Sequence, residues 1–179
     1  KEYEKFIKLN LPKNIKTHFI YKKGSPTIIK KRYVDHINNN KILGVYSIND
    51  EKLDNDNEKK LEILLKKLSL KNDLTIVSDF GHGFISKKIA KKISNQSKFT
   101  SLNAQINAAN IGYHTMENYR NIDCTIINEN ELRHQLRDKD GSLLYLMKNL
   151  ANKLRTNNVV VTQGSLGATL YDKKTKKTF

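Results

Sequence analysis

Residues 124–132, CTIINENEL, and residues 159–172, VVVTQGSLGATLYD, decide the fold class of this sequence. Each stretch opens on a short apolar run, which predicts a buried strand, and then turns polar. Between them, apolar residues recur at helical spacing through residues 142–155, which predicts a helix. A strand, a helix and a second strand in succession predict a βαβ unit and therefore a parallel sheet.

The same alternation extends to both sides of these two stretches. Further strands are predicted at residues 74–77, 99–102 and 168–171, helices at residues 50–70, 86–94 and 129–137, and a helical or irregular segment at residues 105–119. We therefore expect an α/β fold with a mostly parallel sheet that helices cover on both faces.

The amino-terminal part has a different pattern. Residues 17–23, 26–35 and 41–47 alternate polar and apolar side chains, and turn signals lie between them at Gly24 and at three consecutive asparagines, residues 38–40. These segments predict a small antiparallel β unit.

Composition limits the classes of function. The chain has 179 residues, with 33 Lys and Arg against 18 Asp and Glu, and a formal net charge of +15. Only five of the basic residues are Arg, the side chain that base readout and bidentate phosphate binding favour, so nucleic acid is not an expected partner. One Cys excludes an internal disulfide framework and a Cys-based zinc site. No run is long enough to predict a membrane span, and the expected compartment is the cytoplasm.

Polar residues at the carboxyl ends of the predicted strands are the candidate site residues, because ligands of open parallel sheets bind there. Asp79 lies in the segment SDFGHG, residues 78–83, whose glycines let the backbone approach a ligand. A tight turn with Asp79 as a local cap explains the same residues, and His82 is interpreted as a turn residue. The segment is not the Asp-Phe-Gly motif of protein kinases, because the catalytic and glycine-rich loops of those enzymes are missing from the required positions.

The next strand is followed by Asn103, Gln105 and Asn107. Their amides are suited to sugar hydroxyls, although amides also bond locally in loops. Asn128 and Glu131 have the spacing of a helix capping box, which by itself would explain both residues.

Thr162, Gly164 and Gly167 follow the last predicted parallel strand. A hydroxyl and backbone amides in such a turn are suited to phosphate oxygens, and a plain hairpin turn is the alternative. The turn is not a Walker loop, because no Gly-Lys-Ser or Gly-Lys-Thr follows.

These residues carry a resemblance to a known family. Asn128 and Glu131, followed by Thr162, Gly164 and Gly167, resemble the Asn-x-x-Glu and Thr-x-Gly motifs of the ribokinase-like (PfkB-type) carbohydrate kinases.

Upstream segments narrow the resemblance. SPTIIKKRYVD (residues 25–35), VSDFGHGFIS (residues 77–86) and residues 102–133 are similar to the branch of heptose 7-phosphate kinases, whose kinase domain is often fused to a nucleotidyltransferase. The resemblance covers the chain from about Thr17 onward.

The resemblance implies a fold and a reaction. The fold would be a ribokinase-like three-layer sandwich with a small antiparallel lid sheet, in which residues 1–49 are a lid-type β segment and residues 50–179 the central α/β part of the same domain. The reaction would be ATP- and Mg²⁺-dependent phosphorylation of a sugar or sugar phosphate, of the heptose 7-phosphate type used in ADP-heptose and lipopolysaccharide core biosynthesis. The lid strands would also form a homodimer contact.

The resemblance also implies residue roles. The nucleotide would be bound by Asn128, Glu129, Asn130, Glu131, Thr162, Gly164 and Gly167. Glu131 would act on Mg²⁺ through water, and Asp79 and Asn103 would face the sugar.

One part of the family pattern is missing from this sequence. In the family, an Asp in a Gly-Ala-Gly-Asp motif downstream of the Thr-x-Gly strand is the general base. The sequence reaches Phe179 without this motif, so we expect a central fragment, truncated at both ends, that does not catalyse alone. The alternative function is a non-catalytic basic module of the same fold that binds polyanions or acts as a scaffold.

Overall fold

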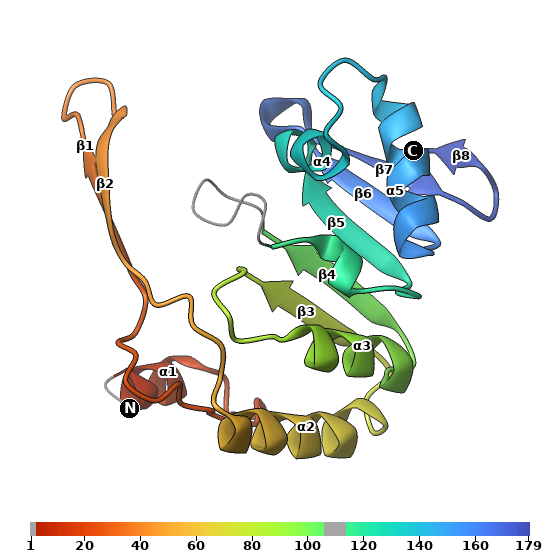
Figure 1. Ribbon diagram of the computed structural model, residues 1–179. Helices are drawn as coiled ribbons and strands as arrows, with labels where there is room; N and C mark the ends of the chain where they lie inside the picture. The colour runs from red at the N-terminus through yellow and green to blue at the C-terminus, as the bar shows by residue number, and fades with distance from the viewer. Residues whose placement is uncertain (1–2, 106–113) are drawn as a thin grey trace.

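A computed structural model describes residues 3–105 and 114–179 of the chain (Figure 1). These residues form a six-stranded sheet in the order β3-β4-β5-β6-β7-β8 and a separate sheet of two strands, β1 and β2. The strands are β1 (Ile29–Val34), β2 (Lys41–Ser47), β3 (Thr75–Asp79), β4 (Thr100–Ala104), β5 (Cys124–Asn128), β6 (Asn158–Thr162), β7 (Ala168–Asp172) and β8 (Lys177–Thr178). The helices are α1 (Glu4–Asn10), α2 (Asn55–Ser69), α3 (Lys87–Gln96), α4 (Glu129–Leu136) and α5 (Leu143–Leu154), with 3-10 turns η1 (Met116–Asn118) and η2 (Gly164–Leu166).

Four strands of the large sheet are parallel. β3 to β6 pair in parallel, while β7 and β8 add to the sheet in antiparallel orientation. The helices α3, α4 and α5 lie in the long connections that parallel pairing requires, whereas β6 and β7 are joined by the short turn at residues 163–167. The mostly parallel sheet and the small antiparallel sheet that the sequence predicts are confirmed.

Side-chain caps fix where the helices begin. Ser86 Oγ accepts a hydrogen bond from the Ile89 amide before α3, and Ser142 Oγ accepts one from the Tyr145 amide before α5. The carboxylate of Asp54 caps α2 in the same way, so that this helix begins five residues later than the apolar pattern predicts. The caps satisfy amides that have no partner inside the helix.

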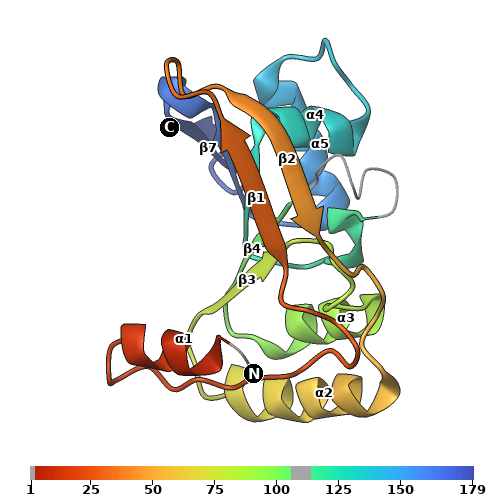
Figure 2. The same cartoon turned by 90° about the vertical axis from the view of Figure 1, so that its left-hand side faces the viewer.

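The helices cover one face of the sheet. Alternate side chains of β3 to β6, such as Val77, Leu102 and Val159, are at most 5% exposed. The side chains between them are half-buried or exposed, and Ile76 is 72% exposed. Figure 2 shows α3, α4 and α5 together on one side of the strands.

The expectation that helices cover both faces is therefore not met within residues 3–105 and 114–179. The strands follow one another in chain order across the sheet, and right-handed connections between strands in that order all pass over the same face.

The amino-terminal part differs from its prediction in one segment. Residues 17–23 form no strand; β1 and β2 pair only with each other, with Ile29 opposite Ser47 and Tyr33 opposite Leu43. Phe19 and Ile20 instead line a cavity together with residues of α2, where there is no strand edge to pair with. The short helix α1 is not predicted by the apolar pattern, and it buries no residue.

The β1–β2 hairpin and its two roots form an arm, residues 22–49. Figures 1 and 2 show the arm standing in front of the carboxyl ends of β3 and β4. Lys22 Nζ joins the two roots of the arm by donating to the Asn49 carbonyl oxygen at 2.6 Å, and it ties the arm to the body by donating to the His82 carbonyl oxygen at 3.2 Å. Farther out, Lys30 Nζ lies 5.6 Å from the centre of the Phe80 ring. The arm is thus placed where a lid over the strand ends would be.

The segment predicted as helical or irregular is described only in part. Its described portion contains the 3-10 turn η1, while residues 106–113, which include Asn107, lie outside the described residues. None of the helices in the described ranges is long and apolar enough to cross a membrane.

Candidate active site

Asp79 is the last residue of β3, and its carboxylate is buried. One oxygen accepts a hydrogen bond from the Tyr119 hydroxyl at 2.8 Å, and the other accepts one from the Gly81 amide at 2.9 Å. His114 Nε2 lies 3.6 Å from the same oxygen that Tyr119 contacts. The side chain of Asp79 is therefore fixed in place, with Tyr119 and His114 supplied by the connection between β4 and β5.

A cavity of about 310 Å³ adjoins this carboxyl end. The arm contributes Lys22, Ser25 and Asn49 to its lining, and the β3 end contributes Asp79 and His82, among others. Apolar side chains complete the lining: Pro26, Ile28, Phe80, Phe84 and Ile85. A concave, largely apolar surface with a few polar groups is typical of a small-molecule site.

His82 also lines this cavity, although the sequence does not mark it as a candidate site residue. Its ring is 5% exposed, its Nδ1 lies 2.7 Å from Asp50 Oδ1, and within the described part of the chain its Nε2 has no hydrogen-bond partner. A carboxylate that orients one ring nitrogen and leaves the other available is a common arrangement in functional histidines. The sequence interpretation took His82 as a turn residue, since Asp50 is 32 residues away.

The backbone at Gly83, directly after His82, has a geometry that only glycine can adopt. Its φ is +76°, and a Cβ atom at this position would lie 2.2 Å from the Glu51 carbonyl oxygen. Only glycine permits this approach, which brings Asp50 within reach of His82.

Asn103 lies beside this group, as the sequence predicts. It is paired with Ser78 across the β3–β4 ladder and is exposed. Its amide group donates to the Ile126 carbonyl oxygen at 3.2 Å, so the local bonding that was the alternative interpretation is present. A contact between Asn103 and a sugar remains a prediction.

The end of β5 forms the capping box that the sequence predicts. Asn128 Oδ1 accepts from the Asn130 amide at 2.9 Å, while Glu131 Oε2 accepts from the Asn128 amide at 3.2 Å. The amide group of Asn128 also donates to the Thr162 carbonyl oxygen at 3.3 Å. Asn128 thereby joins the end of β5 to the end of β6.

Glu129 extends this bridge. Its carboxylate accepts from Gln163 Nε2 at 2.9 Å and from Arg133 Nη2 at 2.7 Å. The Arg133 guanidinium, followed by the Gln163 amide, lowers the pKa of Glu129 below its usual value. Glu129 is thus held as a carboxylate by its neighbours.

The turn after β6 has the open surface that the sequence predicts, but one of its two glycine amides is already used within the turn. Gly164 and Gly167 have φ values of +61° and +88°, and a Cβ atom built on either would meet no atom within 4 Å. The Gly167 amide, however, donates to the Gly164 carbonyl oxygen at 3.1 Å within the turn. The glycines therefore contribute open space beside Thr162, and the amide of Gly167 is already used.

The predicted site residues fall into two neighbouring groups at one edge of the sheet. Asp79 and Asn103 end β3 and β4, and Asn128 and Thr162 are paired at the ends of β5 and β6. The hydrogen bond from Asn103 to the β5 backbone connects the groups. Parallel pairing brings together residues that are up to 83 positions apart, since 162 − 79 = 83.

The residues at the ends of β5 and β6 offer a magnesium ion few protein ligands. Within the described ranges, no three His, Cys, Asp or Glu side chains are grouped so that they could hold a metal ion. Mg²⁺ bound mainly by phosphate oxygens and water needs only one or two carboxylates. The carboxylate of Glu131 at this edge is consistent with such an ion.

No protein-family model and no curated protein matches this sequence. Solved structures do match. A ribokinase from Giardia lamblia has a TM-score of 0.63 at 18% identity, over 87% of this chain and 48% of that one. The fold is ribokinase-like.

Two other solved structures agree with this assignment. Phosphofructokinase-2 from Escherichia coli, in complex with fructose-6-phosphate, has a TM-score of 0.55 at 13% identity, over 76% of this chain and 46% of that one. A putative sugar kinase from Clostridium perfringens has a TM-score of 0.53 at 15% identity, over 83% of this chain and 45% of that one. The ribokinase-like fold is thus shared with sugar kinases, and this chain spans about half the length of each matched structure.

Proposed function

We propose that this chain is the central region of an ATP-dependent sugar kinase, which transfers the γ-phosphoryl group to a hydroxyl of a sugar or sugar phosphate. The observation that supports the proposal most strongly is the bridge between Asn128 and Thr162 at the carboxyl edge of a ribokinase-like sheet. Phosphoryl transfer requires mainly positioning and charge neutralisation, and fixed polar groups at a strand edge can supply both.

The nucleotide would lie over the ends of β5 and β6. Asn128, Glu131 and Thr162 are held there by the capping box and the bridge, and the open space above Gly164 and Gly167 leaves room for a ligand. Glu129 and Asn130 are also among the residues that we propose to bind the nucleotide. Mg²⁺, when bound, would neutralise phosphate charge, and Glu131 would reach it through water.

The sugar would lie in the cavity between the arm and the end of β3. Asp79, His82 and Lys22 line this cavity, with Asn103 nearby. Following the sequence resemblance, we propose a heptose 7-phosphate-type substrate of bacterial surface-sugar biosynthesis. Lys22 would supply a positive charge for the phosphate of such a substrate.

A second copy of the chain is the proposed partner of the arm. Ile29, Tyr33, Leu43 and Val45 share one face of the β1–β2 hairpin and are 45–53% exposed. Lys30, on the opposite face, is the residue that contacts Phe80 of the body. Lys31, opposite Val45, lies on the same face as these four apolar side chains. A two-stranded hairpin is marginally stable alone, so a mainly apolar face turned away from the body favours a homodimer.

The first prediction tests the nucleotide site by binding. In an isothermal titration of the chain with MgATP, Asn128→Ala and Glu131→Ala should each weaken binding at least tenfold. The reason is that each substitution removes a side chain that we propose to hold MgATP at the ends of β5 and β6. Unchanged affinity in both variants would contradict the assignment.

Two controls separate binding from folding. Asn152→Ala removes an exposed asparagine of α5 and should leave the affinity for MgATP unchanged. Asn128→Ser keeps a side-chain acceptor for the cap of α4 but loses the amide that reaches Thr162. It should therefore retain thermal stability while it loses affinity.

The general base is proposed, on the family pattern, to come from a segment that these 179 residues do not include. A coupled assay with ATP, Mg²⁺ and a panel of sugar phosphates should then show no turnover by the chain alone. Clear turnover would refute the proposal of an external base. Binding of RNA with a steep salt dependence, and no binding of MgATP, would favour the polyanion-binding alternative.

A further inference from the structure

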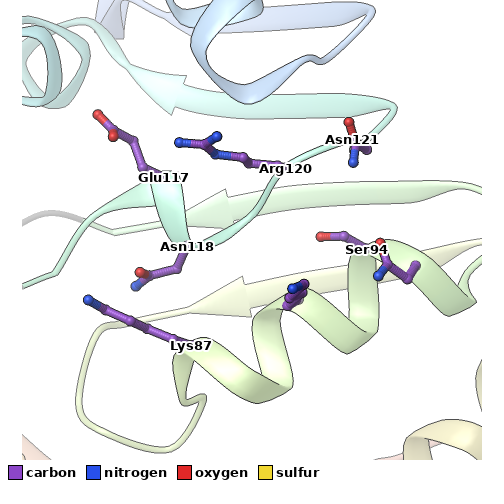
Figure 3. Close-up of a pocket in the computed structure, with 8 residues that line it drawn as sticks. Lys87, Ser94, Glu117, Asn118, Arg120 and Asn121 are labelled. Carbon is purple, nitrogen blue, oxygen red and sulfur yellow. The ribbon is translucent and has the colours of Figure 1, made fainter.

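A second cavity, of about 380 Å³, lies between α3 and the segment that leads into β5 (Figure 3). It shares no lining residue with the cavity beside Asp79 or with the turn after β6. One wall is the exposed side of α3, and the other is the strip of chain at residues 117–121. We call this cavity the α3–η1 groove.

The α3–η1 groove has a surplus of positive charge. Lys87 and Lys91 come from α3, and Arg120 comes from the facing strip. Within the described residues, none of these three side chains makes an ion pair or a hydrogen bond. The one acidic lining residue, Glu117, lies 3.6 Å from Lys153 Nζ. The groove therefore presents three uncompensated cations against one partly neutralised carboxylate.

The rest of the lining consists of hydrogen-bonding side chains. Ser94 and Asn95 belong to α3, while Asn118 and Asn121 belong to the facing strip. In Figure 3, Asn118 points from its wall toward the Lys87 side chain. Side-chain amide donors beside cations are among the groups that hold phosphate oxygens, whereas the Ser94 hydroxyl already donates to the Ala90 carbonyl oxygen at 3.2 Å.

Both walls are anchored in the hydrophobic core. Ile89 and Ile93 fix α3 from below, with exposures of 0% and 4%. Met116 and Tyr119, both fully buried, fix the facing strip, and the Asn121 amide donates to the Leu154 carbonyl oxygen at 2.9 Å. The spacing of the cations is thus set by packing, and a ligand would not have to order the walls.

We propose that the α3–η1 groove binds a small phosphate-bearing anion, at a site separate from the proposed nucleotide and sugar sites. The planar guanidinium of Arg120 is suited to two oxygens of one phosphate, and the lysines add point charges. The volume falls within the range of about 300–1,000 Å³ that is common for small-molecule sites. An extended nucleic acid is disfavoured, because it would need a track of cations along its backbone and not one closed cluster.

The test is a titration of the 179-residue chain with pyrophosphate in 100 mM NaCl, followed by calorimetry and by amide chemical shifts. The expected shifts map to residues 87–95 and 117–121. The triple variant Lys87→Ala/Lys91→Ala/Arg120→Ala should bind at least tenfold more weakly. Shifts confined to residues 162–167, or no measurable binding at 10 mM pyrophosphate, would overturn the proposal.

A matched variant controls for net charge. Lys66→Ala/Lys71→Ala/Lys148→Ala removes three exposed positive charges away from the groove and should change the affinity less than twofold. Equal losses in both triple variants would mean that the anion responds only to the overall charge of +15, which would also overturn the proposal.

A gain-of-affinity variant excludes misfolding as the explanation. Glu117→Gln removes the one negative charge of the lining and should tighten pyrophosphate binding two- to threefold. Unchanged or weaker binding by this variant would contradict an anion site at this position.

Discussion

At the scale of single residues, the buried contact between Tyr119 and Asp79 links two distant parts of the chain. Tyr119 is fully buried, and its hydroxyl donates to Asp79 at 2.8 Å. Burial, followed by the negative charge of Asp79, raises the pKa of Tyr119 well above its usual value. The phenol therefore stays protonated around neutral pH and can donate to Asp79.

The second prediction concerns this hydroxyl. Tyr119→Phe keeps the ring in the core but leaves a buried carboxylate oxygen without its donor. We expect a loss of about 1–3 kcal/mol in the free energy of unfolding. Chemical denaturation measures it, and Tyr145→Phe, at a tyrosine that is 54% exposed, should change little.

Tyr119→Phe also tests whether the hydroxyl of Tyr119 positions Asp79 for the sugar, in addition to stabilising the fold. If Asp79 faces the sugar in the complete kinase, Tyr119→Phe should also raise KM for the sugar more than KM for ATP. Equal stability of the Tyr119→Phe protein and the parent would show that the hydroxyl is not needed to satisfy Asp79.

At the scale of elements, ion pairs hold α2 against α3. Glu62 of α2 pairs with Lys88 at 2.9 Å and also bonds Lys92, one helical turn later. The hydrogen bonds from Lys92 and then Lys88 lower the pKa of Glu62 from 4.5 to about 2. The pairs supplement the buried apolar core nearby, to which Leu61 of α2 and Ile89 of α3 belong.

The third prediction is a pH dependence. Because the pKa of Glu62 is lower in the folded state, its stabilising effect is complete above pH 4.5 and is lost as the pH falls toward 2. We expect the urea midpoint to fall between pH 5 and pH 2. The midpoint of Glu62→Gln should be lower at pH 5 and should fall less over this range.

The control for this prediction is Asp140→Asn, at an exposed carboxylate that makes no ion pair with the described residues. Its midpoint should follow the parent protein at each pH. Parallel curves for Glu62→Gln and the parent would show that the Lys88 and Lys92 pairs add nothing measurable, as is common for surface ion pairs.

At the scale of the whole molecule, the arm carries much of the apolar surface that the body does not cover. On one hairpin face, Ile29, Tyr33, Leu43 and Val45 surround Lys31, while the other face carries Lys30 and Arg32 beside the exposed Tyr46. The face with Val45 is the one that we propose to meet a second copy, because Lys30 on the other face lies 5.6 Å from the Phe80 ring of the body.

The fourth prediction tests that partner. Sedimentation velocity at 50 µM should show a dimer, and Val45→Asp, on the apolar face, should convert it to a monomer. Tyr46→Asp, on the opposite face of the same strand, should remain dimeric. A monomeric parent protein at this concentration would exclude the homodimer.

Much of the fold follows from local patterns. The period-2 and period-3.6 runs place β3 to β7 and α2 to α5 within a few residues, because each element buries one face. Residues 17–23 show the limit of this reasoning. Their alternation is that of a strand, but a strand also needs a neighbouring edge, and their neighbour is α2.

In the candidate site, too, contacts between near neighbours in the sequence could be predicted and contacts between distant residues could not. Asn128 and Glu131 form the expected capping box because its hydrogen bonds span only three residues. The pairs His82 with Asp50 and Asp79 with Tyr119 could not be predicted, since 32 and 40 residues separate their members. The use of the Gly167 amide inside its own turn is likewise a matter of backbone geometry that the letters Gly-x-x-Gly do not contain.

The sequence by itself determined the succession of strands and helices, the motifs at the strand ends and the resemblance to ribokinase-like kinases, because these depend on neighbours along the chain. The tertiary structure alone decided which face of the sheet the helices cover, which carboxylates are buried, and that Lys87, Lys91 and Arg120 line one groove. The physical reason is that burial and electrostatic pairing depend on distance in space, and packing of the core sets that distance.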